Sequence, residues 1–277
     1  MTNHALADAL TLSPQEDGAF SAVLTGDFSN GPSGMAPEHG KPFGGLLAAH
    51  ATTAMRQGLG IQPPLRSLSI QYLAAAGYDA PVIYRPRLLR GGRSVAFASV
   101  EAGDGKRMTL HATATYGADN AAYAVLKPLS APPPPLDSID PERRVSGDMA
   151  PHFTKYVEYR MQTGPNIGGG NAGKPAVERL WMRTRDGRPL DEARLCFLLD
   201  ALYPPAFTVL PQPLGGASVD LRYDILTDPT PELAPDGWAF FEFRMLDLNH
   251  GWTLDDVTVW GADGTPIALA RQRRKLF

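Results

Sequence analysis

Segments in which apolar and polar residues alternate recur along most of the chain. A period of two is typical of β-strands that bury one face. Glycine-rich turns separate many of these segments, which favours antiparallel hairpins. The expected strands are residues 19–24, 65–73, 82–90, 94–102, 106–116, 153–162, 176–184, 217–225, 237–246, 251–260 and 266–276.

Two segments have the composition of buried helices instead. Residues 43–59 (FGGLLAAHATTAMRQGL) are rich in small residues and can pack closely against a sheet. From Asp191 onward a second helix is expected, and its residues 195–205 (LCFLLDALYPP) are apolar nearly all round before Pro204 and Pro205 stop it. The pattern therefore predicts an α+β protein with two helices, each covered by antiparallel strands.

Asp200 is the carboxylate inside the second apolar segment. An acid in such a place is costly unless it is hydrogen-bonded or takes part in chemistry. The segment alone leaves both interpretations open, because Asp200 near a helix end can simply bind a loop.

Gly44 and Gly45 stand at the expected start of the first helix. The free N–H groups at a helix start attract an oxyanion or a phosphate, and glycine lets a ligand come close to them. The pair is therefore a candidate for substrate or oxyanion binding. Tight packing of the helix explains it equally well.

Residues 121–148 separate two sets of elements. They contain four consecutive prolines, Pro132 to Pro135, which are typical of a stiff, extended connector. We therefore expect an N-terminal unit in residues 1–120, a proline-rich connector in residues 121–148, and a C-terminal unit in residues 149–277.

The second unit repeats the first. Residues 92–95 (GRSV) match residues 251–254 (GWTL), and residues 103–105 (GDG) match residues 262–264 (ADG) at the same spacing along the chain. Residues 70–72 (IQY) match residues 221–223 (LRY) at a slightly different spacing, with the difference in a loop. Such a duplication predicts two similar units that pair into one long sheet.

Composition and charge narrow the classes of function. The chain is 43% hydrophobic and 20% charged with a net charge of −3, which favours a soluble globular protein and argues against a nucleic-acid binder. Cys196 is the only cysteine, so an intramolecular disulfide and a cysteine-based zinc site are excluded. The histidines show no metal-ligand spacing, so we expect no metal and no cofactor. No signal peptide and no apolar run long enough to span a membrane are apparent, which predicts a cytoplasmic protein.

Both halves resemble a known family, the acyl-CoA thioesterase II-like proteins with a double hotdog fold. The likeness rests on residues 43–49 (FGGLLAA), 67–116, 197–206 (FLLDALYPPA), 217–223 (ASVDLRY) and 268–276 (ALARQRRKL). The resemblance implies that each half is a hotdog, a helix gripped by a curved antiparallel sheet. It also implies a thioester hydrolase that converts an acyl-CoA to free acid and coenzyme A without a cofactor, and that self-associates into a homo-oligomer.

In that family the attacking water lies between an Asp in the helix, a Thr or Ser in the next strand, and a Gln in the last strand. The matching residues here are Asp200, Ser218 and Gln272, and Ser218 keeps the hydroxyl of the commoner Thr. The resemblance implies that Asp200 accepts a proton from water while Ser218 and Gln272 fix its position. The Gln272 amide or the N–H groups of Gly44 and Gly45 are candidate donors to the carbonyl oxygen.

Other residues admit more than one interpretation. Glu38 and His39 lie where some single-hotdog thioesterases carry an acid or a histidine, and are otherwise loop residues at a pocket mouth. His50 lies opposite Asp200 in the duplication, which fits a residue lining the interface between the halves, and it fits a satisfied core histidine better. The basic residues of the last strand fit coenzyme A phosphates or a charged strand edge that discourages aggregation: Arg271, Arg273, Arg274 and Lys275.

Two other functions remain open on the sequence. One is a non-catalytic module that binds acyl thioesters, in which Asp200 is structural. The other is a thioesterase that acts on an acyl chain bound to a carrier protein. A serine-hydrolase elbow, G-x-S-x-G, is not present.

Overall fold

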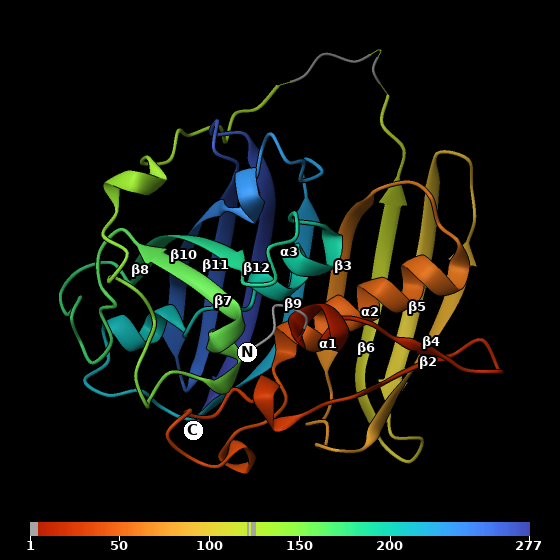
Figure 1. Ribbon diagram of the computed structural model, residues 1–277, viewed down its shortest axis with the longest axis horizontal. Coiled ribbons are helices and arrows are strands. Elements are labelled where there is room, and N and C mark those ends of the chain that lie inside the picture. The colour runs from red at the N-terminus through yellow and green to blue at the C-terminus, as the bar shows by residue number, and fades with distance from the viewer. Residues whose placement is uncertain (1–4, 121, 123–125) are drawn as a thin grey trace.

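A computed structural model describes residues 5–120, 122 and 126–277 of the chain. Its strands form one sheet of 12 strands in the order β1-β2-β4-β5-β6-β3-β9-β12-β11-β10-β8-β7. Helices α2 (Gly44–Leu59) and α3 (Glu192–Leu198) pack against each other (Figure 1). The shorter helical elements are α1 (Ala5–Ala9), η1 (Gly26–Phe28), η2 (Pro37–His39), η3 (Leu136–Ser138), η4 (His152–Tyr156), η5 (Pro205–Thr208) and η6 (Pro235–Gly237).

The first half is a helix held by antiparallel strands. From the outer edge inward the strands are β1 (Ser13–Pro14), β2 (Phe20–Val23), β4 (Pro81–Arg90), β5 (Val95–Gly103), β6 (Met108–Gly117) and β3 (Leu65–Tyr72). Helix α2 enters the chain between β2 and β3 and packs against β4 and β5. It ends at Leu59 because Gly60 adopts a left-handed conformation, with φ of 58°, that glycine takes without strain.

The second half repeats this order. From the junction outward its strands are β9 (Gly216–Ile225), β12 (Pro266–Leu276), β11 (Trp252–Trp260), β10 (Ala239–Asn249), β8 (Val177–Thr184) and β7 (Val157–Met161). Helix α3 lies between β8 and β9 in the chain, just as α2 lies between β2 and β3. The predicted duplication is therefore present as a repeated topology.

Strands β3 and β9 join the two halves into one sheet. They pair antiparallel, and Ile70 lies directly opposite Leu221. These two residues are also counterparts in the sequence repeat, so each faces its own equivalent, as a twofold axis between them requires. The predicted single long sheet and the double hotdog fold are confirmed.

The core fills the space between the helices and the sheet. Small residues of α2, such as Ala48 and Ala51, are fully buried, and Thr52 Oγ1 lies 3.6 Å from Cys196 Sγ of α3. The small side chains thus let the two helices touch. Each large apolar side chain buried in this layer stabilises the fold by about 1.5–3 kcal/mol.

Two elements differ from the sequence prediction. Helix α3 ends at Leu198, so Asp200 lies in the turn that follows and not in the middle of a helix. Residues 153–156, expected as strand, belong to the 3-10 helix η4. There the ring of Phe153 stacks on Phe43 at 3.8 Å between centroids.

The described part of the connector crosses the outer side of the second half. Trp181 Nε1 donates to the Pro134 carbonyl at 3.0 Å, and Trp260 Nε1 donates to the Leu129 carbonyl at 2.8 Å. Ile139 of the connector packs in a small apolar cluster with Trp181, Trp238 and Phe240 of the second half. The boundaries expected for the connector, residues 121–148, stay a prediction.

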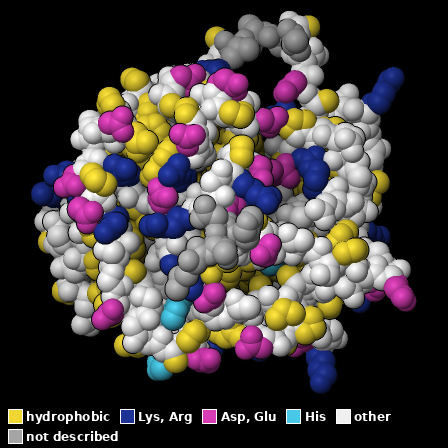
Figure 2. All heavy atoms as spheres, in the orientation of Figure 1, with side chains coloured by type: hydrophobic (Ala, Val, Ile, Leu, Met, Phe, Trp, Pro, Cys, Tyr) yellow, Lys and Arg dark blue, Asp and Glu magenta, His cyan; other side chains and the backbone are white. Residues whose placement is uncertain are grey.

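Charges of both signs are interspersed over the face shown in Figure 2, in keeping with the small net charge. This face does not present the broad basic patch of a nucleic-acid binder. Of the helices in the described residues, none combines the length and the apolar character needed to cross a membrane.

Candidate active site

Asp200 occupies a turn that is held from two sides. Tyr159 Oη donates to the Ala201 carbonyl at 2.9 Å, and Tyr203 Oη donates to the buried Glu178 carboxylate at 2.6 Å. Tyr203 directly precedes Pro204, and a residue before proline disfavours helical backbone dihedrals. These contacts explain why the chain leaves the helix and presents the Asp200 side chain, which is 7% exposed, to the interior.

The Asp200 carboxylate lies against the start of α2. A Cβ at Gly44 would lie 2.8 Å from Asp200 Oδ2, and one at Gly45 would lie 2.6 Å from the Phe197 carbonyl oxygen. Only glycine permits this approach. The Gly45 N–H contacts the carboxylate, so Asp200 supplies the negative charge that the N-terminus of α2 favours.

Ser218 of β9 and Gln272 of β12 meet Asp200 at this point. Gln272 Nε2 lies 2.8 Å from Asp200 Oδ1 and 2.7 Å from Ser218 Oγ. A carboxylate only accepts hydrogen bonds, so the amide nitrogen must face it. The structure thus brings together all three predicted residues, with Gly44 and Gly45 beside them.

A β-bulge aims Ser218 into the site. Along β12, Arg273 pairs with Asp220 but Arg274 pairs with Ser218, so Val219 is the extra residue. The bulge places Ser218 on the same buried face of the sheet as Leu221. In a regular strand, Val219 would occupy that face instead.

Two charged residues outside the predicted catalytic set lie beside the site. Arg274 is buried, with Nη2 3.6 Å from Asp200 Oδ1, and its Nη1 binds Asp255 Oδ2. Strand alternation could have found both, since Arg274 shares the face of Gln272, and Asp255 shares the face of the buried Val257.

The interpretation of the last strand as a charged edge is wrong. Strand β12 lies in the interior of the sheet, between β9 and β11. Its outward residue Arg271 pairs with Asp256 across the strands, with Nε 2.7 Å from Oδ1.

Burial dominates the electrostatics of Asp200. It raises the pKa of the carboxyl above its ordinary value, while Arg274, Gln272 and the Gly45 N–H oppose this shift by favouring the ionised form. Burial also raises the pKa of Tyr72 and Tyr223 well above the ordinary value, so both phenols stay neutral.

The two tyrosines differ in their hydrogen bonds. Tyr72 Oη donates to the Gly44 carbonyl at 2.8 Å. The hydroxyl of Tyr223 is buried and has no hydrogen-bond partner among the described residues.

The remaining candidates lie elsewhere. Glu38 and His39 are exposed on η2, where His39 Nδ1 lies 3.1 Å from the Ala36 carbonyl. His50 is the satisfied core histidine that was expected, with Nδ1 3.0 Å from Tyr84 Oη and Nε2 2.6 Å from the Ala9 carbonyl. The described residues contain no group of three or more side chains arranged to hold a metal ion.

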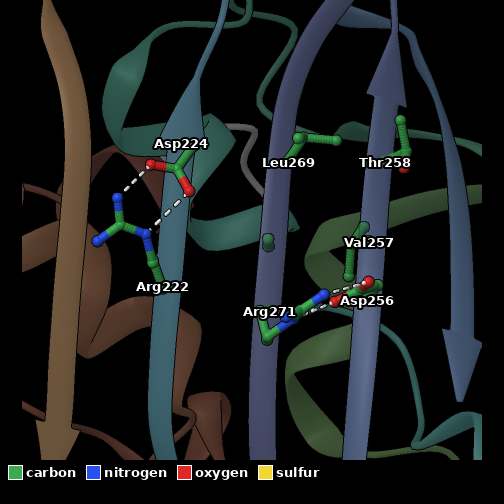
Figure 3. Close-up of a pocket in the computed structure, with 8 residues that line it drawn as sticks. Arg222, Asp224, Asp256, Val257, Thr258, Leu269 and Arg271 are labelled. Atoms are coloured by element: carbon green, nitrogen blue, oxygen red, sulfur yellow. Dashed lines mark hydrogen bonds and ion pairs between the residues drawn. The ribbon is translucent and has the colours of Figure 1, made fainter. Parts of the chain in front are cut away.

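A polar hollow on the opposite face of the sheet is separate from this site. It has a volume of about 230 Å³ and is lined by residues that include Arg222, Asp224, Asp256 and Arg271. Figure 3 shows that their charges are already paired, Arg222 with Asp224 and Arg271 with Asp256. Because Arg271 and Gln272 are adjacent on one strand, they point to opposite faces.

Two models of a known protein family match the chain. Residues 32–117 match the family model of the acyl-CoA thioesterase N-terminal domain, and residues 128–273 match that of the acyl-CoA thioesterase C-terminal domain. None of the curated proteins matches the chain.

Several solved structures share the fold. A hot dog fold protein of unknown function from Alicyclobacillus acidocaldarius is 22% identical, with a TM-score of 0.84 over 99% of this chain and 98% of that one. The tesB protein of Mycobacterium avium subs paratuberculosis is 16% identical, with a TM-score of 0.78 over 100% of both chains. The acyl-CoA thioesterase II TesB2 of Mycobacterium marinum is 15% identical, with a TM-score of 0.73 over 99% of this chain and 98% of that one.

At these identities the structural likeness shows only the fold. The family models, in contrast, match the amino-acid sequence. The model of the C-terminal domain alone spans more than half of the chain and includes Asp200, Ser218 and Gln272. The chain therefore belongs to the acyl-CoA thioesterase family and is a thioester hydrolase.

Proposed function

We propose that this chain hydrolyses an acyl-CoA to the free acid and coenzyme A with a water molecule that Asp200 activates. The observation that carries the proposal is the convergence of Asp200, Ser218 and Gln272, in which one amide nitrogen lies within 2.8 Å of both oxygen-bearing partners. Side chains from three separate elements meet at one buried point, which a purely local structural role for Asp200 does not require.

Asp200 is suited to act as a general base. In the proposed step, the water oxygen bonds to the thioester carbonyl carbon and one water proton passes to the Asp200 carboxylate. The tetrahedral intermediate then collapses, the carbon–sulfur bond breaks, and the proton held by Asp200 returns to the departing thiolate. Burial raises the pKa of Asp200, which makes the ionised form a stronger base than an exposed aspartate.

Ser218 and Gln272 orient the water. The Ser218 hydroxyl can accept from the amide and donate to water at the same time. The Gln272 amide holds both Asp200 and Ser218 in place, so the two groups that face the water have a fixed separation. Orientation of this kind removes part of the entropic barrier before the reaction begins.

The carbonyl oxygen needs a donor when it becomes negative. Both N–H groups of Gln272 are directed at Asp200 and Ser218, and the Gly45 N–H meets Asp200. We therefore propose the Gly44 N–H, at the positive end of α2, as the oxyanion donor.

The form of the thioester is tested by comparing one acyl group on three carriers: coenzyme A, pantetheine and an acyl carrier protein. We expect the highest kcat/KM on the coenzyme A thioester, measured as release of free thiol. A preference for the carrier protein would replace coenzyme A as the substrate. Tight binding of every thioester without turnover, in protein that is folded by circular dichroism, would contradict hydrolysis.

A further inference from the structure

Asp200 shares a buried cation with a second carboxylate. Arg274 lies between Asp200 and Asp255, with Nη2 3.6 Å from Asp200 Oδ1 and Nη1 bonded to Asp255 Oδ2. The side chains of Arg274 and Asp200 are each 7% exposed, and that of Asp255 is 1% exposed. The cluster therefore sets two carboxyl groups against one guanidinium, almost entirely removed from water.

Strand register links this cluster to the proposed water-binding residues. Across β12 and β11, Asp255 lies directly opposite Gln272. Across β12 and β9, Arg274 lies opposite Ser218. The Arg274–Asp255 pair therefore lies directly beside the residues that surround Asp200.

The Arg274–Asp255 pair is costly as a structural device. Asp255 Oδ1 is buried and has no hydrogen-bond partner among the described residues. An unsatisfied buried polar atom costs about 1–3 kcal/mol, and a buried ion pair seldom stabilises a fold more than apolar residues of similar volume. The pair is thus better explained by its effect on the ionisation of Asp200.

Asp200 needs a cation. Burial raises the pKa of Asp200, and Arg274 is the charge that opposes this shift. The other groups around Asp200 are neutral: Tyr72 from β3, Tyr223 from β9, the Gly45 N–H from α2, and Cys196 from α3, which faces both tyrosines. Asp255 from β11 competes for the same cation.

We propose that Arg274 is a positioning residue for hydrolysis, which keeps Asp200 ionised in its buried site, and that Asp255 limits this effect by drawing the guanidinium toward itself. The inference deepens the proposed function and rests on it. A base that is stabilised too strongly loses its affinity for a proton, and one that is stabilised too weakly is protonated before it can act. The shared arginine sets Asp200 between these limits.

The two partners are expected to act in opposite directions on the pH profile. In Arg274→Gln the cation is lost, so Asp200 ionises at higher pH and the acidic limb of kcat/KM moves up by about 1–3 pH units. In Asp255→Asn the arginine is free to turn toward Asp200, so the limb moves down by about one unit. The double variant removes both charges and is expected between wild type and Arg274→Gln.

The chain offers a matched control on the same two strands. Arg271 and Asp256 pair across β12 and β11 but point to the outer face of the sheet (Figure 3). Arg271→Gln and Asp256→Asn are expected to leave the acidic limb in place. Arg274→Lys keeps the charge but not the planar guanidinium. Its acidic limb of kcat/KM should therefore lie close to that of wild type, while kcat stays reduced.

A second readout does not depend on activity. Aspartate labelled with 13C at the carboxyl carbon reports the ionisation of Asp200 by NMR, with Asp200→Asn used to assign the signal. The expected order of midpoints is Asp255→Asn, wild type, the double variant and Arg274→Gln, from low pH to high. If wild type hydrolyses no acyl-CoA, the proposed function fails while this titration still tests the inference.

The double variant also guards against misfolding, because it removes the buried Asp255 carboxylate that Arg274→Gln leaves without its ion-pair partner. Shifts of opposite sign in the single variants support the inference. Shifts of the same sign in the two single variants overturn it, because loss of either partner of a merely structural pair would disturb the site in the same way. An unchanged midpoint in folded Asp255→Asn and in the folded double variant also overturns it.

Discussion

The surroundings of Asp200 disfavour its ionised form. Its carboxylate is buried, and the pKa is raised because burial outweighs the help from Arg274, Gln272 and the Gly45 N–H. A carboxyl whose pKa is higher in the folded than in the unfolded state binds its proton more tightly when folded. Its contribution to stability is therefore full at low pH and is lost as pH rises through the folded-state pKa.

The direction of this pH dependence of stability gives a prediction for Asp200→Asn. The neutral amide avoids the cost of an ionised buried acid, so the variant should have a higher Tm than wild type at pH 8, and the difference should shrink at pH 5. Thermal unfolding at both values measures it. Asp256→Asn, on the outer face, should change stability by no more than about 0.5 kcal/mol. An Asp200→Asn variant that is less stable than wild type at pH 8 would show that the ionised carboxylate stabilises the fold.

The hydroxyl at residue 218 is expected to matter more than the exact side chain. Ser218→Ala removes the acceptor for the Gln272 amide, which lies 2.7 Å away, and leaves the water less well oriented. We expect kcat/KM on an acyl-CoA to fall by about 10- to 100-fold, as for other losses of positioning. Ser218→Thr keeps the hydroxyl and should retain most of the activity. Equal activity in all three proteins would remove Ser218 from the mechanism.

At the scale of single elements, the N-terminal helix α1 is fixed to the first half through His50. The Ala9 carbonyl only accepts hydrogen bonds, so His50 Nε2 must carry the proton and Nδ1 must accept from Tyr84 Oη. Burial lowers the pKa of His50 from 6.5 to about 4. The stability that this neutral histidine provides is complete above pH 6.5 and is lost as pH falls toward 4.

We therefore expect acid to loosen α1 before the rest of the fold. Hydrogen-exchange protection of residues 6–12, corrected for intrinsic rates, should be lower at pH 4.5 than at pH 7.5. His50→Gln cannot take up a proton and keeps a donor for the Ala9 carbonyl, so its protection should change less. An identical loss of protection in wild type and His50→Gln would assign the effect to other groups.

The strands were predictable because the alternation of apolar and polar residues along each strand shows which of its faces is buried. The turn after α3 was not, because its course depends on partners that are distant in the sequence: Tyr159 Oη on the Ala201 carbonyl, and Glu178 on Tyr203. Ser218 shows the same limit, since strict alternation would turn it away from the face of Leu221, and the bulge at Val219 restores it. Sequence alone identified which residues meet, through family resemblance, but not the contacts that aim them.

Arg274 illustrates a different limit. Its side-chain face followed from its spacing to Gln272, but a basic run is ordinarily solvated, and only the position of β12 inside the sheet shows otherwise. Position in a sheet depends on topology, which the local pattern of a strand does not contain.

On the scale of the whole molecule, one sheet joins the two halves, so we expect them to unfold as one cooperative unit. Strands β3 and β9 pair from Ser67 opposite Asp224 to Gln71 opposite Asp220, and α2 packs on α3. The site itself spans both halves, because Gly44 comes from the first and Asp200 from the second. Further self-association into a homo-oligomer stays a prediction.

Cooperativity across the junction predicts one unfolding transition. Ile70, which is 1% exposed at the junction, should cost about 2–5 kcal/mol when changed to Ala and should lower the Tm without splitting the transition. The neighbouring exposed residue gives the control, since Gln71→Ala should have little effect. Differential scanning calorimetry distinguishes these outcomes. Two separate transitions in wild type would mean that the halves unfold independently.

The most direct test of hydrolysis by an Asp200-activated water is thiol release from short, medium, long and aromatic acyl-CoAs. Wild type, Asp200→Asn and the outer-face control Asp256→Asn would be assayed side by side. We predict turnover by wild type and by the control, and a loss of about 10²- to 10⁴-fold in folded Asp200→Asn, the range for a missing general base. Full activity in Asp200→Asn, or no turnover by wild type on any of these substrates, would contradict the proposed mechanism.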